Sequence, residues 1–129
     1  MTVPGLTFDL PPERSDPHLY FVISVPTLFA QVAIANFTTR RDPCDTACIV
    51  RRGEHPFVQR ETIVAYDRSR LVDVDEFQKR VDAGIYRLRT DSLSQELLLR
   101  IQNGALASAH TAGKVQDAVR WTLEGGDEA

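Results

Sequence analysis

The chain has 129 residues, of which 43% are apolar and 26% are charged, and its formal net charge is −3. This length and composition indicate one soluble globular domain large enough to bury its own core. No apolar run approaches the ~18 residues that a membrane-spanning helix needs, and the acidic balance argues against a broad nucleic-acid-coating surface. The amino terminus lacks a basic region followed by a long apolar run, so we expect no secretory signal and a cytoplasmic protein.

The first half of the chain is predicted to form strands. Residues 1–17 contain four prolines and are expected to form an extended arm, in which alternating Leu6, Phe8 and Leu10 favour pairing as an edge strand. Residues 18–25 form a nearly continuous apolar run, which is typical of a strand buried on both faces. Further strands are predicted at residues 31–38, 47–50 and 62–66.

The second half is predicted to be mainly helical. Asp73 opens a capping-box pattern, which predicts a helix that ends at Gly84. A short strand is expected at residues 85–88, and Ser92 opens a second capping box before the next helix. Residues 113–123 are expected to form the last helix. The buried stripe of the middle helix is predicted to consist of Leu93, Leu97, Leu98, Ile101 and Ala105.

Strands that precede helices favour an α+β fold. We expect a small, curved antiparallel sheet or an SH3-like barrel, followed by two to three helices. The predicted single domain spans residues 1–129. Its expected parts are the extended arm (1–17), a barrel-like sheet with one inserted helix (18–90), the C-terminal helices (91–123) and a frayed tail (124–129).

Two cysteines and a histidine raise the question of a metal site. Thiolates and imidazoles are the ligands that zinc prefers, so Cys44, Cys48 and His55 are a candidate set. Their spacing begins Cys-x₃-Cys, no second pair completes four ligands, and Cys48 lies in an apolar strand. The sequence therefore predicts no metal and no other cofactor, and a zinc-dependent protein stays the minor alternative.

Five residues are candidates for phosphodiester chemistry. Thr39, Arg40 and Arg41 follow a buried strand, where guanidinium groups would stabilise charge on phosphoryl oxygens and a hydroxyl would orient or donate. His18 and His55 are the candidate general acids or bases, since each is expected at a strand end. The alternative for all five is a structural role, as strand-end threonines, solubilising arginines and hydrogen-bonded histidines.

Arginine dominates the basic residues, since lysine occurs only at positions 79 and 114. The planar arginine fork suits phosphate better than the lysine ammonium does. A surface of solvated charges is the alternative. Candidate RNA-binding residues are Arg51, Arg52, Arg60, Arg68 and Arg70.

Four short motifs carry a resemblance to a known family. They are Phe-Val-Ile-Ser at residues 21–24, Ala-Asn-Phe-Thr-Thr at 35–39, Pro-Phe at 56–57 and the stretch 65–71 with its Asp-containing junction. In these motifs the chain resembles the MazF/PemK-like toxins, the small SH3-like barrels of toxin–antitoxin systems, over roughly residues 18–106.

The resemblance implies a metal-independent endoribonuclease that acts on single-stranded RNA, forms a homodimer and binds a cognate antitoxin protein. By position, Thr39 would be its hydroxyl residue, with Arg40 or Arg41 supplying the charge. The chain lacks the family's opening strand and the basic loop that bears the catalytic arginine, so only Arg14 or His18 stands near that place. Another reading, from a different functional class, is a non-catalytic SH3-like module that binds a protein partner.

Overall fold

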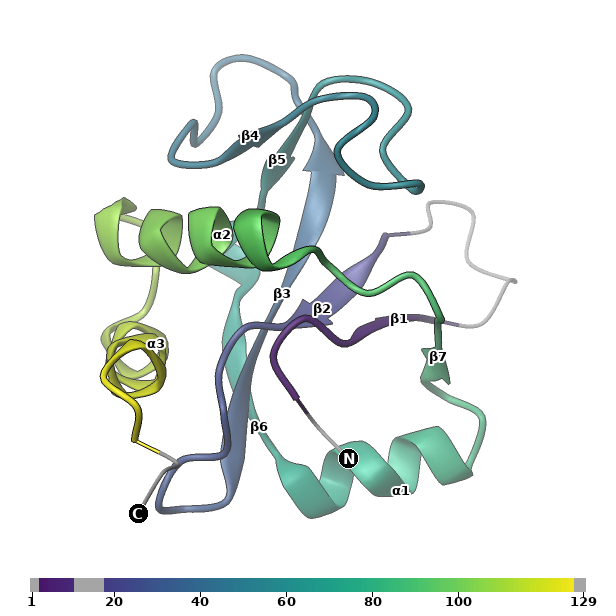
Figure 1. Ribbon diagram of the computed structural model, residues 1–129, viewed down its shortest axis with the longest axis vertical. Helices are drawn as coiled ribbons and strands as arrows, with labels where there is room; N and C mark the ends of the chain where they lie inside the picture. Colours follow the sequence, from purple (N-terminus) through teal and green to yellow (C-terminus); the bar gives the residue numbers. More distant parts are fainter. Residues whose placement is uncertain (1–2, 11–17, 127–129) are drawn as a thin grey trace.

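The computed structural model describes residues 3–10 and 18–126. These residues form an open antiparallel sheet of seven strands with three α-helices (Figure 1). In chain order the elements are β1 (Thr7–Asp9), β2 (Tyr20–Val22), β3 (Gln31–Thr39), β4 (Ile49–Val50), β5 (Thr62–Val64), the 3₁₀ turn η1 (Tyr66–Arg68), β6 (Arg70–Asp73), α1 (Val74–Asp82), β7 (Arg87–Leu88), α2 (Gln95–Ala107) and α3 (Gly113–Leu123).

The nine-residue strand β3 is the centre of the sheet. Its pairing with β2 sets Val22 opposite Ile34. On its other edge β6 pairs with the first half of β3 and β5 with the second half. The strand order is β4-β5-β3-β2-β1-β7, and the outer strands β4 and β7 do not pair with each other among the described residues. The predicted α+β fold with a small antiparallel sheet is confirmed, and the sheet is open rather than closed into a barrel.

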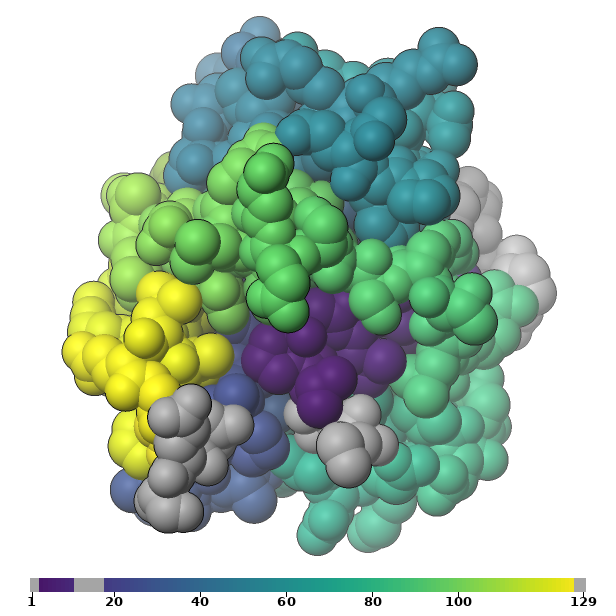
Figure 2. Space-filling view, viewed as in Figure 1, coloured from purple at the N-terminus to yellow at the C-terminus, as the bar shows by residue number. Residues whose placement is uncertain are grey.

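The sheet is covered on both faces, which explains why its central strands are nearly continuous in apolar residues. Phe21 and Phe37 point into the larger core beneath α2 and α3. Val22 and Ile34, which alternate with them, pack in a second core with Phe77 of α1. In the space-filling view, α2 (green) and the N-terminal residues (purple) lie at the middle of the side of the molecule that carries α2 (Figure 2).

The strands predicted at residues 18–25, 47–50, 62–66 and 85–88 are shorter in the structure, as β2, β4, β5 and β7, and two other predicted elements differ in kind or place. The stretch around residues 67–70, expected to be a polar junction, contains η1 and the start of β6. This turn lets β5 and β6 pair with the same edge of β3. Within the arm, β1 lies between β2 and β7 rather than at the edge of the sheet. Residues 11–17 of the arm, Arg14 included, lie outside the described residues. No helix in the described part is long and apolar enough to cross a membrane.

The helix bounds follow the prediction closely, whereas neither of the two predicted capping boxes forms. Gly84 has a φ of +76°, as expected for the residue after α1. Asp73 is the N-cap of α1, but its side chain makes no capping bond and instead accepts from Gln31 Nε2 at 3.2 Å. The cap of α2 is Ser94 rather than Ser92, and its Oγ accepts a hydrogen bond from Leu97 N at 3.1 Å. Helix α3 has the predicted bounds.

The two serines before α2 provide a matched pair for a test. We expect Ser94→Ala to lower the free energy of unfolding by about 1 kcal/mol, because it removes the side-chain acceptor of a helix N-terminus. Ser92→Ala is expected to cost only a few tenths of a kcal/mol, since Ser92 is exposed and caps nothing. Urea unfolding of both variants measures the difference, and equal losses would contradict this assignment of the cap.

Candidate functional site

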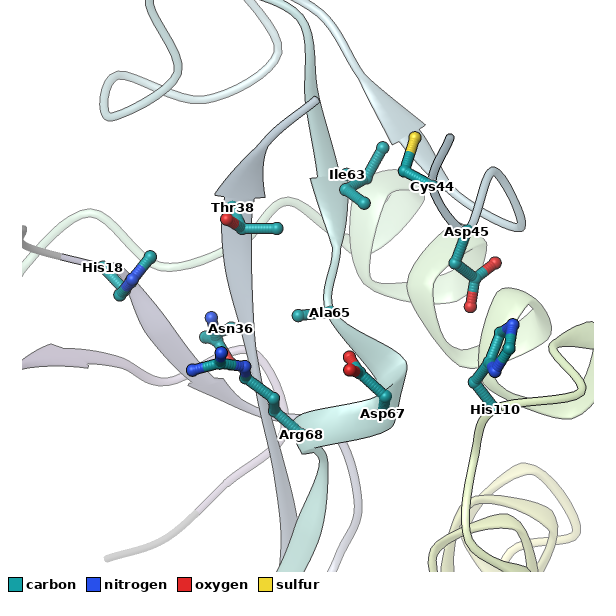
Figure 3. Close-up of a pocket in the computed structure, with 10 residues that line it drawn as sticks. All are labelled: His18, Asn36, Thr38, Cys44, Asp45, Ile63, Ala65, Asp67, Arg68 and His110. Carbon is teal, nitrogen blue, oxygen red and sulfur yellow. The ribbon is translucent and has the colours of Figure 1, made fainter. Parts of the chain in front are cut away.

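A hollow of about 410 Å³ opens beside the second half of β3 (Figure 3). Asn36 and Thr38 of β3 line it together with Ile63 of β5. In the strands these side chains alternate with Phe37 and Val64, which belong to the core under α2. The hollow therefore lies on the opposite face of the sheet from α2, in a part that α1 does not cover.

Chemically active side chains surround this hollow. His18 lies on one side and His110 on the opposite side (Figure 3). Asp67 and Arg68 of η1 enter from the rim between the two histidines. Arg68 is exposed and makes no ion pair with any described residue. The hollow thus combines two imidazoles with a cation, a set that can transfer protons and stabilise an anion.

The backbone of β3 orients His18. Its Nδ1 lies 3.0 Å from the carbonyl oxygen of Phe37, and the next residue, Leu19, accepts a backbone hydrogen bond from Phe37. A carbonyl oxygen can only accept, so Nδ1 carries a proton. In the neutral imidazole Nε2 is then the acceptor nitrogen. This tautomer can take up a proton from a substrate, as a general base does.

Tertiary contacts bring His110 to the hollow. Ser108, at the end of α2, donates through Oγ to Asp45 Oδ2 at 2.5 Å and accepts from the backbone N–H of His110 at 3.0 Å. These bonds tie the connection between α2 and α3 to the loop after β3. His110 was not among the predicted site residues, because no motif surrounds it and more than 70 residues separate it from β3 in the sequence.

A second hollow, of about 260 Å³, adjoins the first at His18 and Thr38, which line both. It lies at the end of β3 and is also lined by Thr39, Arg41 and Phe57. Three of the five predicted catalytic residues, His18, Thr39 and Arg41, therefore meet in one place. Their catalytic role stays a prediction, and Phe57, which was not among the predicted site residues, lines the same hollow.

The neighbouring residues Arg40 and Arg41 differ in their environment. Arg40 donates to Asp42 Oδ1 at 3.0 Å and to Glu61 Oε1 at 2.6 Å, and these hydrogen bonds raise its pKa. Its charge is thus compensated within the protein. Arg41 is exposed and makes no ion pair within the described part of the chain, so it remains available to an anionic ligand.

His55 lies apart from both hollows and is buried, with 4% of its surface exposed. Its Nδ1 accepts from the backbone N–H of Phe57 at 3.1 Å, and its Nε2 lies 2.6 Å from the carbonyl oxygen of Asp91. Both ring nitrogens are therefore engaged, with the proton on Nε2. In this arrangement His55 joins the turn that carries Phe57 to the segment before α2, as the structural alternative predicted.

Next to this contact, Arg89 holds the side chain of Asp91 with two hydrogen bonds of 2.9 and 2.7 Å. The guanidinium group lowers the pKa of Asp91. Because the folded-state pKa is lowered, the carboxylate adds stability above its unfolded pKa of about 4, and this contribution is lost as the pH falls through the folded pKa.

We therefore expect Asp91→Asn to be less stable than the parent at pH 7, with a difference that shrinks below pH ~4. Urea unfolding at pH 7 and pH 3 measures this. Asp117→Asn, which alters an exposed ion pair, serves as the control and is expected to change little at either pH. A deficit of the same size at both pH values for Asp91→Asn would contradict the prediction.

The predicted RNA-binding arginines do not form one surface. Arg68 lines the first hollow, whereas Arg70 on β6 lines a separate hollow beside α1. Arg52 and Arg60 are exposed in the loops around β4 and β5. In the same region, Nε of Arg51 lies 3.6 Å from Oε2 of Glu61. Of these five arginines, only Arg68 lines either of the two hollows beside His18.

The structure does not assemble the zinc ligands considered for this chain. Cys44 donates through Sγ to Asp42 Oδ1 at 3.2 Å, and Cys48 is buried, which raises the pKa of its thiol. His55 uses both ring nitrogens elsewhere. In the described part of the chain, no group of three or more His, Cys, Asp or Glu side chains is placed to hold a metal ion.

Three comparisons with known proteins found no relative of this chain. No family model, no curated protein and no solved structure matches this chain. The resemblance to the MazF/PemK-like toxins therefore stays a prediction, and the two hollows beside His18 are the basis on which a function is assigned.

Proposed function

We propose that the protein is a metal-independent endoribonuclease that cleaves single-stranded RNA in the hollow between His18 and His110. The observation that carries this proposal is the placement of two histidines on opposite sides of one hollow, with the exposed Arg68 beside them. In-line cleavage of a phosphodiester needs a base and an acid on opposite sides of the phosphorus, together with a cation for the phosphoryl oxygens.

In the first step, His18 removes the proton from a ribose 2′-hydroxyl. The hydrogen bond from Nδ1 to the Phe37 carbonyl leaves Nε2 as the acceptor of that proton. The 2′-oxygen forms a bond to the adjacent phosphorus, and negative charge develops on the non-bridging oxygens. Arg68 stabilises this charge, and the Thr38 hydroxyl donates a hydrogen bond to it.

The bond between phosphorus and the 5′-oxygen then breaks. Protonated His110 donates its proton to the departing 5′-oxygen, so no free alkoxide forms. The products are a 2′,3′-cyclic phosphate and a 5′-hydroxyl, and the two histidines have exchanged protonation states. Solvent returns them to the starting state. Because the attacking group is the 2′-hydroxyl, DNA is not a substrate.

The whole chain is acidic and the first hollow contains the carboxylates of Asp45 and Asp67, but two arginines at the site are exposed toward a ligand. Arg68 and Arg41 are both exposed and are not paired with carboxylates in the described part of the chain. Asp45, a carboxylate of the same hollow, is already engaged by the Ser108 hydroxyl and the Ala47 N–H. Phosphate contacts by arginine supply much of the affinity of a protein for RNA.

The test is incubation of the purified protein with a long single-stranded RNA in EDTA, followed by analysis of the new ends. We expect cuts that leave 2′,3′-cyclic phosphates and 5′-hydroxyls, with single-stranded DNA of the same sequence left intact. Intact RNA in the presence of folded protein, or cleavage that EDTA abolishes, would overturn the proposal.

A protein-binding module is the second candidate function, and one observation favours it. Leu28 and Phe29, at the tip of the β2–β3 connection, are 83% and 84% exposed. Ala30 beside them has a φ of +56°, and an adjoining hollow of about 350 Å³ is lined by Trp121. If this tip binds a second copy of the chain, the parent will sediment as a dimer and Phe29→Ser as a monomer.

A further inference from the structure

The second hollow, at the end of β3, has no task in the cleavage step. It shares His18 and Thr38 with the first hollow, so the two form neighbouring compartments along one strand. We infer that this second hollow binds one unstacked nucleobase of a single-stranded RNA whose adjacent phosphate lies in the first hollow. The inference rests on the proposed function, because it assigns a second contact of the same substrate.

An aromatic residue, Phe57, lines this hollow and contacts a guanidinium group. Phe57 is half-buried, and the guanidinium carbon of Arg89 lies 5.8 Å from its ring centroid. Its backbone N–H donates to His55, which in turn contacts Asp91. These contacts position the backbone of Phe57 and place a cation over its ring before any ligand arrives, which reduces the ordering required on binding. Bases of single-stranded nucleic acids commonly stack on such rings.

The other walls of the hollow carry hydrogen-bonding groups. Thr39, which is half-buried and lines this hollow, carries a hydroxyl that can donate to or accept from the edge of a base. The Thr62 hydroxyl donates to the carbonyl of Arg60 at 2.8 Å, so its oxygen remains an acceptor for a ligand. An aromatic platform with polar groups at its side suits a base more than a bare phosphate or an acyl chain.

Arg41 completes the compartment with a cation. It lines the hollow, is exposed and makes no ion pair to residues that the structure describes. Together with Arg68 in the first hollow, it provides a positive charge on each side of His18. A strand that crosses His18 would therefore meet a cation, an imidazole and a second cation in turn. A base inside a duplex is not free to enter, which restricts the ligand to single strands.

Binding of a non-cleavable strand tests this inference separately from catalysis. The probe is a fluorescent 2′-O-methyl RNA octamer, which lacks the attacking hydroxyl, and anisotropy gives its Kd. We expect Phe57→Leu to bind about 10-fold more weakly, whereas Phe57→Tyr, which keeps the ring, binds like the parent. Arg41→Gln is expected to weaken binding and to reduce the salt dependence by about one counterion. Lys79→Gln, on the exposed side of α1, is the control for loss of one positive charge.

The outcomes separate the two proposals. Equal affinity of the parent and of folded Phe57→Leu and Arg41→Gln, or no binding by the parent, overturns the base-binding hollow. Weaker binding by these two variants supports it, even if unmodified RNA stays intact, in which case only the ribonuclease is overturned. Because the Arg41 side chain is exposed, Arg41→Gln gives an answer that does not depend on how Phe57→Leu folds.

Discussion

Replacing Gly104 with alanine is expected to lower the free energy of unfolding by about 3 kcal/mol, because α2 has no room for a side chain there. A Cβ at this position would lie 2.2 Å from the hydroxyl oxygen of Tyr66 and 3.1 Å from Cys48 Cβ. The Tyr66 hydroxyl is buried and donates to the carbonyl of Ile101 at 2.7 Å. The added methyl group therefore forces either helix α2 or the Tyr66 ring to move and breaks a buried hydrogen bond.

Two matched variants test this mechanism in urea unfolding. Gly113→Ala, in the first turn of α3, is expected to be neutral or slightly stabilising, because no atom lies within 4 Å of the place that its methyl group would take. Tyr66→Phe is expected to cost about 1 kcal/mol alone but to recover part of the loss in the Gly104→Ala background, since it removes the closest atom. Additive losses in the double variant would show that the clash is not the cause.

Removal of either histidine of the first hollow is expected to slow RNA cleavage by about 10²- to 10⁴-fold, the usual contribution of a general acid or base. The His110 side chain is exposed, so His110→Ala leaves the fold intact. For His18, asparagine is the better substitution, because its amide can still donate to the Phe37 carbonyl that His18 Nδ1 contacts. Lys79→Gln, on the exposed side of α1, is the control and should cleave like the parent.

The pH dependence of kcat/KM distinguishes the two roles. The parent is expected to show a bell-shaped profile, since the base must be neutral and the acid protonated. His18→Asn should lose the rise on the acidic side, and His110→Ala the fall on the alkaline side. Unchanged rates in both folded variants would place the chemistry away from this hollow. A loss of rate with both limbs of the profile intact would indicate that the histidines position the substrate instead.

The sequence by itself determined the elements whose signals are local. Apolar runs predicted the central strand β3, and the last helix was predicted at residues 113–123, the observed bounds of α3. Gly84 marked the end of α1 because a left-handed residue is needed there. The order of these elements sufficed for the α+β class. Such patterns involve residues close together in the sequence, so they can be recognised without knowledge of the fold.

Other features were decided only by contacts between distant segments. Ser92 and Ser94 both precede a helical pattern, but Leu93 between them donates a backbone hydrogen bond to the distant Gly5, and only Ser94 caps α2. Arg40 and Arg41 are adjacent in the sequence, yet of the two only Arg40 is paired with Glu61, which directly precedes β5.

The site itself belongs to this second group. His55 became a structural residue because Asp91 supplies its partner, whereas His110 reached the hollow through the Asp45–Ser108 bond. A hydrogen bond between residues tens of positions apart leaves no periodic trace in the sequence, because its geometry exists only after the sheet and helices have packed. Local sequence patterns therefore determined the helices and strands, whereas tertiary packing determined which histidines and arginines line the two hollows.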